Sequence, residues 1–132
     1  MPNSLLSGEG AVGTYSELLK KGCRGDNLTP HHIPSNAFME AKVPAYTRNK
    51  GIAMMMEHLS PGMGGRHRET LSYGQSPNLN ILPRQALARE VWDVRSIYLC
   101  QGLYTPEIKR GLQQVIQQNK LAWQGVFDKW RV

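Results

Sequence analysis

Apolar residues recur at helical spacing in the last third of the chain. Four of them follow at steps of four, three and four residues, so they form one stripe along a helix. Pro83 suits the first turn of that helix, and Gly102 suits its end. The pattern predicts a helix from Pro83 to about Cys100, with an apolar face made of Leu87, Val91, Val94 and Tyr98.

A second helix is predicted directly after the first. Thr105 can cap its first turn, and Pro106 fits the first helical position because no N–H is needed there. One face of this helix is apolar, and the aromatic residues beyond it are expected to pack the tail onto the domain. The face consists of Ile108, Leu112, Val115 and Ile116, and the aromatic residues are Trp123, Phe127 and Trp130.

The beginning of the chain has a weaker pattern. Residues 1–13 contain three glycines among small and polar residues, which predicts a linker or leader outside a single domain of residues 14–132. Thr14 or Ser16 is expected to cap a short helix that ends before Gly22.

The middle of the chain combines breaks with one apolar run. Prolines in residues 24–44 exclude a long helix, because each removes a backbone donor, so extended chain and turns are expected there. The run of residues 51–58 predicts a strand, and its three methionines are expected in the core. Residues 66–73 predict a short helix that ends at Gly74. Together these patterns predict an α+β fold.

Basic residues outnumber acidic ones. The 132 residues include 16 Lys and Arg against 10 Asp and Glu, which gives a formal net charge of +6. The excess is concentrated in residues 42–68, where Glu57 is the single acid. This balance is compatible with a nucleic-acid partner.

Other classes of protein are disfavoured. No apolar run approaches the ~20 residues that a membrane span needs, and no signal peptide is visible at the N-terminus. Two cysteines, Cys23 and Cys100, do not make a disulfide framework, and we expect both to be reduced thiols.

All four histidines fall within 37 residues, in the half of the chain with the least regular pattern. His31 and His32 are adjacent, and Pro30 and Pro34 restrict the backbone on both sides of them. Neighbouring side chains of an extended segment point to opposite faces, so two such rings do not easily chelate one ion side by side. They can instead divide the work, one binding a metal and the other activating water as a general base.

Hydrolysis of a phosphodiester needs this division of work. The attacking water must lose a proton, and a cation must neutralise the charge that develops on the phosphate and the leaving oxygen. Nearby arginines can hold the flanking phosphates. His67 lies between Arg66 and Arg68 at the start of the predicted short helix, where it offers a second ligand, and His58 ends the predicted strand, where it can complete the shell.

Simpler interpretations stand beside this one. A histidine can be ordinary polar surface, and the adjacent pair can belong to a turn. Glu57 and Glu69 are expected at the surface, although either can add an oxygen ligand. The charged residues of the helix of residues 83–100 are most simply a solvated face, and they are Arg84, Arg89, Glu90, Asp93 and Arg95.

Three segments together resemble toxin nuclease domains of the HNH/endonuclease superfamily, which form the C-termini of bacterial polymorphic toxins and secretion-system effectors. The resemblance covers roughly residues 13–120. It implies a ββα-metal core, in which two strands and a helix hold one divalent cation, with further C-terminal helices. The segments are Gly13-Thr14-Tyr15-Ser16-Glu17-Leu18, Leu28-Thr29-Pro30-His31-His32-Ile33-Pro34-Ser35 and His67-Arg68-Glu69-Thr70-Leu71-Ser72-Tyr73-Gly74.

The resemblance also implies roles. In the superfamily's His-His pattern the first histidine binds metal and the second activates water. A second helical histidine four residues after His67 is absent, because Leu71 stands there, which leaves His58 and Glu57 as options for the third ligand. The resulting assignment gives catalysis to His32, Arg68 and Asn49 (with Asn36 as the other candidate for orienting the base), metal binding to His31, His67 and His58, and nucleic-acid contacts to Arg66, Lys50 and Arg48.

The implied function is that of a metal-dependent nuclease, using Mg²⁺, Mn²⁺, Ni²⁺ or Zn²⁺ and acting on DNA more than on RNA. Such domains are carried by a larger delivery protein into the cytoplasm of a competing cell, and the producer is protected by an immunity protein. Two other hypotheses remain. One is a basic nucleic-acid-binding module without chemistry, and the other is a metal-independent ribonuclease in which His31 and His32 shuttle protons.

Overall fold

The computed structural model describes residues 4–59 and 64–128, and it is an α+β fold as the sequence predicts. Its sheet has three antiparallel strands in the order β1-β3-β2, so β3 is the central strand. The elements are β1 (Val12–Thr14), α1 (Tyr15–Lys21), β2 (Leu28–His32), α2 (Asn36–Lys42), the 3-10 turn η1 (Arg48–Lys50), β3 (Ile52–Glu57), the 3-10 turn η2 (Arg66–Glu69), α3 (Pro83–Cys100) and α4 (Pro106–Ala122).

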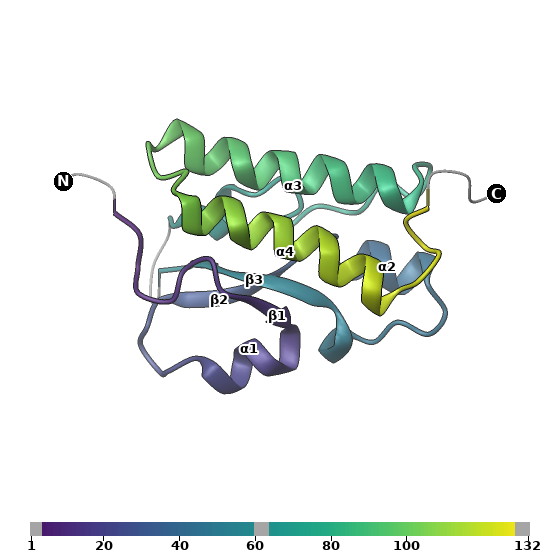
Figure 1. Cartoon of the computed structure of the whole chain (residues 1–132), viewed down its shortest axis with the longest axis horizontal. Coiled ribbons are helices and arrows are strands. Elements are labelled where there is room, and N and C mark those ends of the chain that lie inside the picture. Colours follow the sequence, from purple (N-terminus) through teal and green to yellow (C-terminus); the bar gives the residue numbers. More distant parts are fainter. Residues whose placement is uncertain (1–3, 60–63, 129–132) are drawn as a thin grey trace.

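Helices cover both faces of the sheet. Figure 1 shows α1 on one side of the strands and α4 on the other, with α3 lying along the outer side of α4. The central strand β3 is therefore buried on both faces, which explains its nearly continuous apolar sequence. Met54 and Met56 pack into the larger core with α3 and α4, whereas Ala53 and Met55 pack against Leu18 of α1. The prediction that the methionines fill the core is confirmed.

Local signals in the sequence fix most helix ends. Thr14 caps α1 through a capping box with Glu17, and Thr105 accepts a hydrogen bond from the N–H of Ile108 at the start of α4. The two long helices begin at Pro83 and Pro106, as predicted. Trp123 and Phe127 are buried beyond α4, also as predicted, whereas Trp130 lies outside the described residues.

The predicted linker is wrong for the part of residues 1–13 that the structure describes. Val12 and Gly13 pair with Met54 and Ala53 in the sheet, and the N–H of Gly10 donates to the carbonyl of Met55. Glu9 is buried. Residues 4–13 therefore belong to the folded domain, because their small residues allow the chain to lie close against β3 and α4.

Two further local predictions need correction. Seven residues between the prolines form the helix α2, which Ser35 caps by accepting a hydrogen bond from the N–H of Phe38. The short helix expected over residues 66–73 is only the 3-10 turn η2, followed by turns up to Gly74. The predicted ββα-metal core therefore matches the structure only at the level of an α+β fold.

The structure also bears on the predictions about membrane spans and cysteines. Among residues 4–59 and 64–128, no helix combines the length and apolar character needed to cross a membrane. Cys23 and Cys100 are both free thiols at the surface, as predicted.

Candidate functional site

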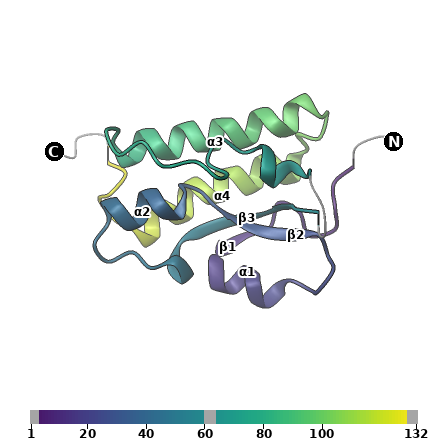
Figure 2. The same cartoon turned by 180° about the vertical axis from the view of Figure 1, so that it is seen from behind.

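A polar pocket of about 260 Å³ lies where β2 ends, and we call it the histidine pocket. Figure 2 shows the described part of the segment before α3, residues 64–82, passing between α3 and β2, and His67 of this segment lines the pocket. Three of the four histidines line the pocket. Its lining residues are Tyr15, Thr29, Pro30, His31, His32, Ser35, Asn36, Arg48, His67, Ser72, Tyr73 and Gly74.

The sheet register separates His31 from His32. His31 lies opposite Met54, whose side chain belongs to the core under α4, and His32 lies opposite Ala53, whose side chain faces α1. Directly opposed residues of antiparallel strands share a face, so the two imidazoles leave β2 on opposite sides. Both still reach the histidine pocket because they stand at the end of the strand. The two rings therefore leave the strand on opposite faces, as expected for neighbouring residues of an extended segment.

His32 is held between α1 and η1. Its ring stacks on Tyr15 with centroids 4.5 Å apart, and its Nε2 lies 2.9 Å from the carbonyl oxygen of Arg48. A carbonyl only accepts, so Nε2 carries the proton and Nδ1 keeps its lone pair. Burial lowers the pKa of His32, which keeps the ring neutral. A neutral ring with a free Nδ1 is suited to accept a proton from water.

His31 lies on the other side of β2, against His67. It is 5 % exposed, and the two rings meet edge to face with centroids 5.0 Å apart. Burial, reinforced by the neighbouring His67, lowers the pKa of His31 to about 3. The ring is neutral at physiological pH, which is the form that binds metal ions.

A chain of hydrogen bonds runs from Arg68 through His58 to His67. Arg68 lies 3.1 Å from Nε2 of His58, and Nδ1 of His58 lies 2.9 Å from Nδ1 of His67. A guanidinium only donates, so Nε2 of His58 accepts and its Nδ1 donates to His67. Burial lowers the pKa of His67 to about 4, with His58 and Arg68 adding to the effect. The chain fixes the orientation of the His67 ring.

This chain changes the roles expected for His58 and Arg68. His58 does not line the histidine pocket and lies behind His67. Arg68 also donates to the carbonyl of Gly64 at 2.6 Å, and it lies outside the pocket lining. Both residues are therefore placed to position His67 and not to contact a substrate in the pocket.

Arg66 does not have the place expected of a phosphate contact. It is 2 % exposed, and its guanidinium donates to both carboxylate oxygens of Glu9 at 2.7 Å. Burial alone would raise the pKa of Glu9, but hydrogen bonds from Arg66 and Tyr98 hold that pKa below its usual value. Arg66 is an internal anchor that fixes η2 and hence the neighbouring His67. The prediction that Arg66 contacts nucleic acid is therefore wrong, because its guanidinium is buried against Glu9.

Sequence reasoning missed this ion pair because Glu9 and Arg66 are 57 residues apart. One signal was available, since Glu9 is the single acid among the first 16 residues of a segment otherwise made of apolar, small and polar residues.

The turn η1 supplies the cation that faces the pocket. Arg48 lines the wall, donates to the hydroxyl of Tyr15 at 3.2 Å and is exposed enough to meet a phosphate. Asn49 and Lys50 are exposed on the same turn, outside the pocket lining.

Asn36, the alternative to Asn49, is the asparagine in the histidine pocket. Its side-chain nitrogen donates to Glu40 at 2.6 Å. Its Oδ1 is buried and lacks a hydrogen-bond partner among the described residues. Asn36 is therefore better placed than Asn49 to contact a group bound in the pocket.

The donor set bears on the predicted metal. Within residues 4–59 and 64–128, no three His, Cys, Asp or Glu side chains are grouped to hold one ion, so the expected shell of three histidines is not formed there. His31 and His67 are the pair that both line the pocket and contact each other. In the arrangement described, Nδ1 of His67 accepts from His58 and its Nε2 carries the proton, so a cation at this pair requires the tautomers of His58 and His67 to reverse.

No family model, curated protein or solved structure matches the chain. The function must therefore be argued from the site.

Proposed function

We propose that this chain is a metal-dependent nuclease that hydrolyses phosphodiester bonds, in DNA more readily than in RNA. The observation that carries the proposal is the contact of His31 with His67 in a polar pocket that His32 and Arg48 also line. The pocket thus combines two potential metal ligands, one potential base and one cation suited to phosphate.

Each residue has a role that follows from its surroundings. His31 and His67 would hold the cation. For this the hydrogen bond between His58 and His67 must reverse, so that His67 donates from Nδ1 to His58 and the lone pair of its Nε2 becomes available to the ion. A bound divalent cation supplies charge neutralisation at the phosphate oxygens. His32 accepts a proton from the attacking water at Nδ1, because Nε2 is held by the carbonyl of Arg48. Arg48 binds a phosphate oxygen at the pocket wall.

The state of the histidines favours this function over a metal-independent ribonuclease. Proton shuttling between two histidines needs one protonated imidazole near neutral pH to act as the acid. The pKa values of all four histidines are lowered, and burial is the largest cause in each. Neutral rings are suited to metal binding and to base catalysis, but not to donating a proton to the leaving group.

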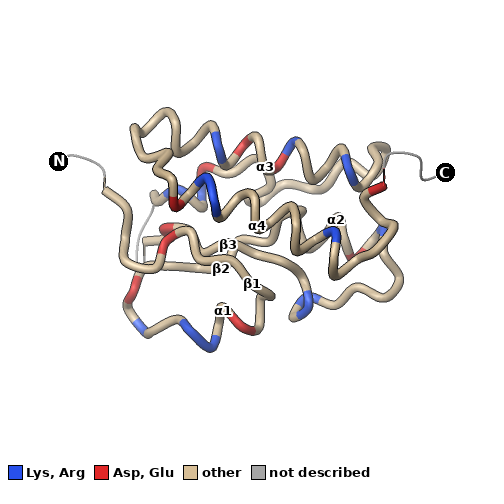
Figure 3. The backbone as a smooth tube through the Cα atoms, viewed as in Figure 1, with Lys and Arg blue, Asp and Glu red and all other residues tan. Residues whose placement is uncertain are grey.

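The distribution of charge favours it over a non-catalytic binding module. Figure 3 shows basic and acidic residues mixed along the helices, whereas a module that binds by charge alone needs a basic stripe on one face. Such a module also gives no reason for three histidines to share a pocket.

The biological part of the proposal rests on the resemblance to HNH toxin domains. It comprises delivery into the cytoplasm of a competing cell by a larger protein, and inhibition by a cognate immunity protein in the producer. A direct check is expression in a bacterial cytoplasm, where the chain should degrade DNA and arrest growth unless His32 is replaced.

The biochemical test uses the purified chain and supercoiled plasmid. We expect nicking with Mg²⁺, Mn²⁺, Ni²⁺ or Zn²⁺ and none in excess chelator. His32→Ala should slow cleavage about 10²–10⁴-fold through loss of the base. His67→Ala should slow it more than about 100-fold, since even residues behind a metal ligand contribute 10–100-fold. Arg110→Ala, which removes an exposed charge from α4, is the matched control and should cleave normally.

Two results would overturn the proposal. Cleavage that persists in excess chelator contradicts the metal, and an unchanged rate for His32→Ala contradicts the base. Calorimetric titration of the protein with Mn²⁺ adds a readout independent of activity, in which His67→Ala should bind more weakly than the parent chain.

A further inference from the structure

A second pocket of about 70 Å³ lies beside the histidine pocket, and we call it the Glu90 pocket. Glu90 projects into it from α3 and is 9 % exposed. Its Oε1 is buried and finds no hydrogen-bond partner within the described residues, although the carboxyl group receives a hydrogen bond from the Ser35 backbone. Burying an unsatisfied carboxyl group is costly, so folding alone gives no reason for an acid at this position.

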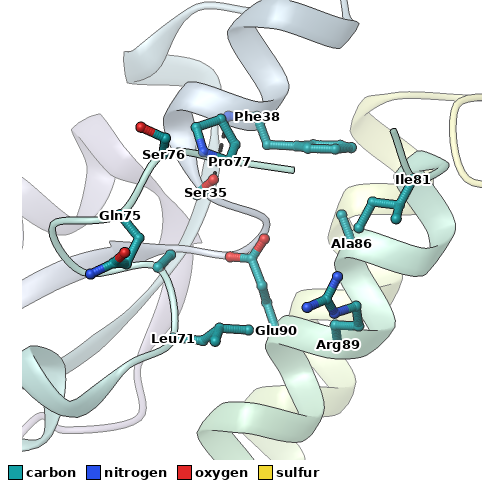
Figure 4. Close-up of a pocket in the computed structure, with 11 residues that line it drawn as sticks. Ser35, Phe38, Leu71, Gln75, Ser76, Pro77, Ile81, Ala86, Arg89 and Glu90 are labelled. Atoms are coloured by element: carbon teal, nitrogen blue, oxygen red, sulfur yellow. Dashed lines mark hydrogen bonds between the residues drawn. The ribbon is translucent and has the colours of Figure 1, made fainter. Parts of the chain in front are cut away.

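The walls of the Glu90 pocket suit a flat, partly apolar group. Figure 4 shows the Glu90 carboxyl group directed into the space between Leu71 and Pro77, with Phe38 at the far side and Arg89 close by on α3. The volume accommodates about five water-sized groups. That is enough for the hydrogen-bonding edge of a nucleobase, while the rest of the base would lie at the pocket mouth.

The two pockets share a wall. Ser35 and Ser72 line both the Glu90 pocket and the histidine pocket. Ser35 directly follows the segment His31–Pro34, and Ser72 lies five residues after His67, so the shared wall is built from the same two chain segments as the candidate site. A base held against Glu90 would therefore carry its phosphate toward the histidines.

The chemistry of the two charged side chains selects among the bases. A carboxylate accepts two hydrogen bonds side by side, and guanine presents N1–H and N2–H as two adjacent donors. Arg89 supplies donors, which match the O6 and N7 acceptors of the same base. Adenine and cytosine each set an acceptor nitrogen beside one amino donor, and uracil or thymine sets a single donor between two carbonyl groups. These four bases place a lone pair against the carboxylate.

We propose that the Glu90 pocket is a base-recognition subsite that selects guanine next to the phosphodiester to be cleaved. This inference rests on the proposed nuclease function. A base enters such a pocket only when it is unstacked, so the preferred substrate is single-stranded or has an extruded guanine.

Binding of free nucleotides tests the subsite without any cleavage. The full chain is titrated with guanosine, adenosine, cytidine and uridine 5′-monophosphate in chelator at pH 8, where Glu90 is ionised, and affinity is measured by calorimetry. We expect guanosine monophosphate to bind about tenfold or more tightly than the other three. Glu90→Gln should remove that preference, because an amide presents one donor and one acceptor. Arg89→Ala changes an exposed position, so the variant should fold normally. Its affinity for guanosine monophosphate should be several times lower than that of the parent chain.

Glu107→Gln is the matched control, because it neutralises an exposed carboxylate in the first turn of α4 and should leave nucleotide binding unchanged. Circular dichroism of each variant shows whether it is folded. Mapping of cleavage positions on a mixed-sequence single strand gives the second readout, and cuts should cluster at guanine in the parent chain and spread over all bases in Glu90→Gln.

The outcomes separate this inference from the proposed function. Equal affinity for the four nucleotides, or a guanine preference that survives in Glu90→Gln, overturns the subsite. Metal-dependent cleavage without base preference keeps the nuclease and removes the subsite. A guanine preference in binding that Glu90→Gln abolishes, in a chain that cleaves nothing, supports the subsite and overturns the nuclease.

Discussion

The histidine pocket and the Glu90 pocket are neighbours with opposite chemistry. The first is polar, and it holds imidazoles whose pKa values are lowered by burial, to about 3 for His31 and about 4 for His67. The second is mostly apolar, and burial raises the pKa of Glu90 to about 7. In both pockets burial shifts the pKa toward the uncharged form, because it penalises the charge of a base and of an acid alike. His31 and His67 are therefore neutral at pH 7, whereas Glu90 is ionised in part at pH 7 and becomes a carboxylate above it.

The ion pair of Glu9 with Arg66 shows what both pockets lack. Both residues of that pair are buried, yet each keeps its charge because the partner is in direct contact. Deep burial therefore does not neutralise a group by itself. A buried group shifts toward its uncharged form when no opposite charge contacts it. His31 and Glu90 are in this situation, and both keep lone pairs that a bound molecule can use.

The largest expected effect is the loss of stability when Glu9, the partner of Arg66, is removed. Glu9→Ala leaves the Arg66 guanidinium buried without its counter-ion, and it should destabilise the fold by about 3–5 kcal/mol. Urea denaturation followed by circular dichroism measures the loss. Glu107→Ala, at an exposed carboxylate, should cost less than about 1 kcal/mol. Equal losses in the two variants would mean that the buried pair has no special part in stability.

The next effect separates the pockets by pH. The folded pKa of Glu90, about 7, lies above its ordinary value of 4.5. Its contribution to stability is therefore complete below pH 4.5 and is lost as pH rises through 7. Glu90→Gln carries no ionisable group at this position, so its stability relative to the parent chain should increase from pH 5 to pH 8 by up to about 3 kcal/mol. Melting temperatures at the two pH values measure the change.

The charged groups around Glu90 set the limits of that test. Asp93 raises its pKa and Arg89 lowers it, and both are unchanged in the variant. His31 and His67 act in the opposite direction, because the unfolded chain takes up their protons first as pH falls below 6.5. They are present in both proteins and cancel in the difference. A difference between parent and variant that is the same at pH 5 and pH 8 would contradict a raised pKa at Glu90.

The smallest effect concerns the support behind His67. His58→Ala removes the hydrogen bond to Nδ1 of His67 but leaves every pocket-lining residue in place. We expect metal affinity and cleavage to fall about 10–100-fold, as for other residues that orient a metal-bound histidine. The pH profile should keep its shape, since His32 is untouched. Loss of activity as severe as that of His67→Ala would instead make His58 a direct ligand.

Charge and local spacing misled the sequence interpretation at the residues where tertiary contacts decide. Arg66 and Arg68 are both arginines next to His67, so the sequence does not distinguish them. In the structure, Arg66 is buried against Glu9 and Arg68 contacts His58. Glu90 was expected on a solvated helix face, and it is instead nine-tenths buried against α2 and the segment before α3. Neither placement is encoded in the pattern of the nearest ten residues.

The sequence by itself determined the elements whose signals are local. Thr14, Pro83, Thr105 and Pro106 mark helix starts because caps and first-turn prolines act on the adjacent backbone, and the apolar run of residues 51–56 marks the central strand. It also predicted that the four histidines act together, and His31, His32 and His67 line the histidine pocket whereas His58 does not. The tertiary structure alone decided which side chains face that pocket, that Glu9 anchors Arg66, and that Glu90 is buried beside it. Each of these depends on contacts between residues far apart in the chain, whose partners no local spacing specifies.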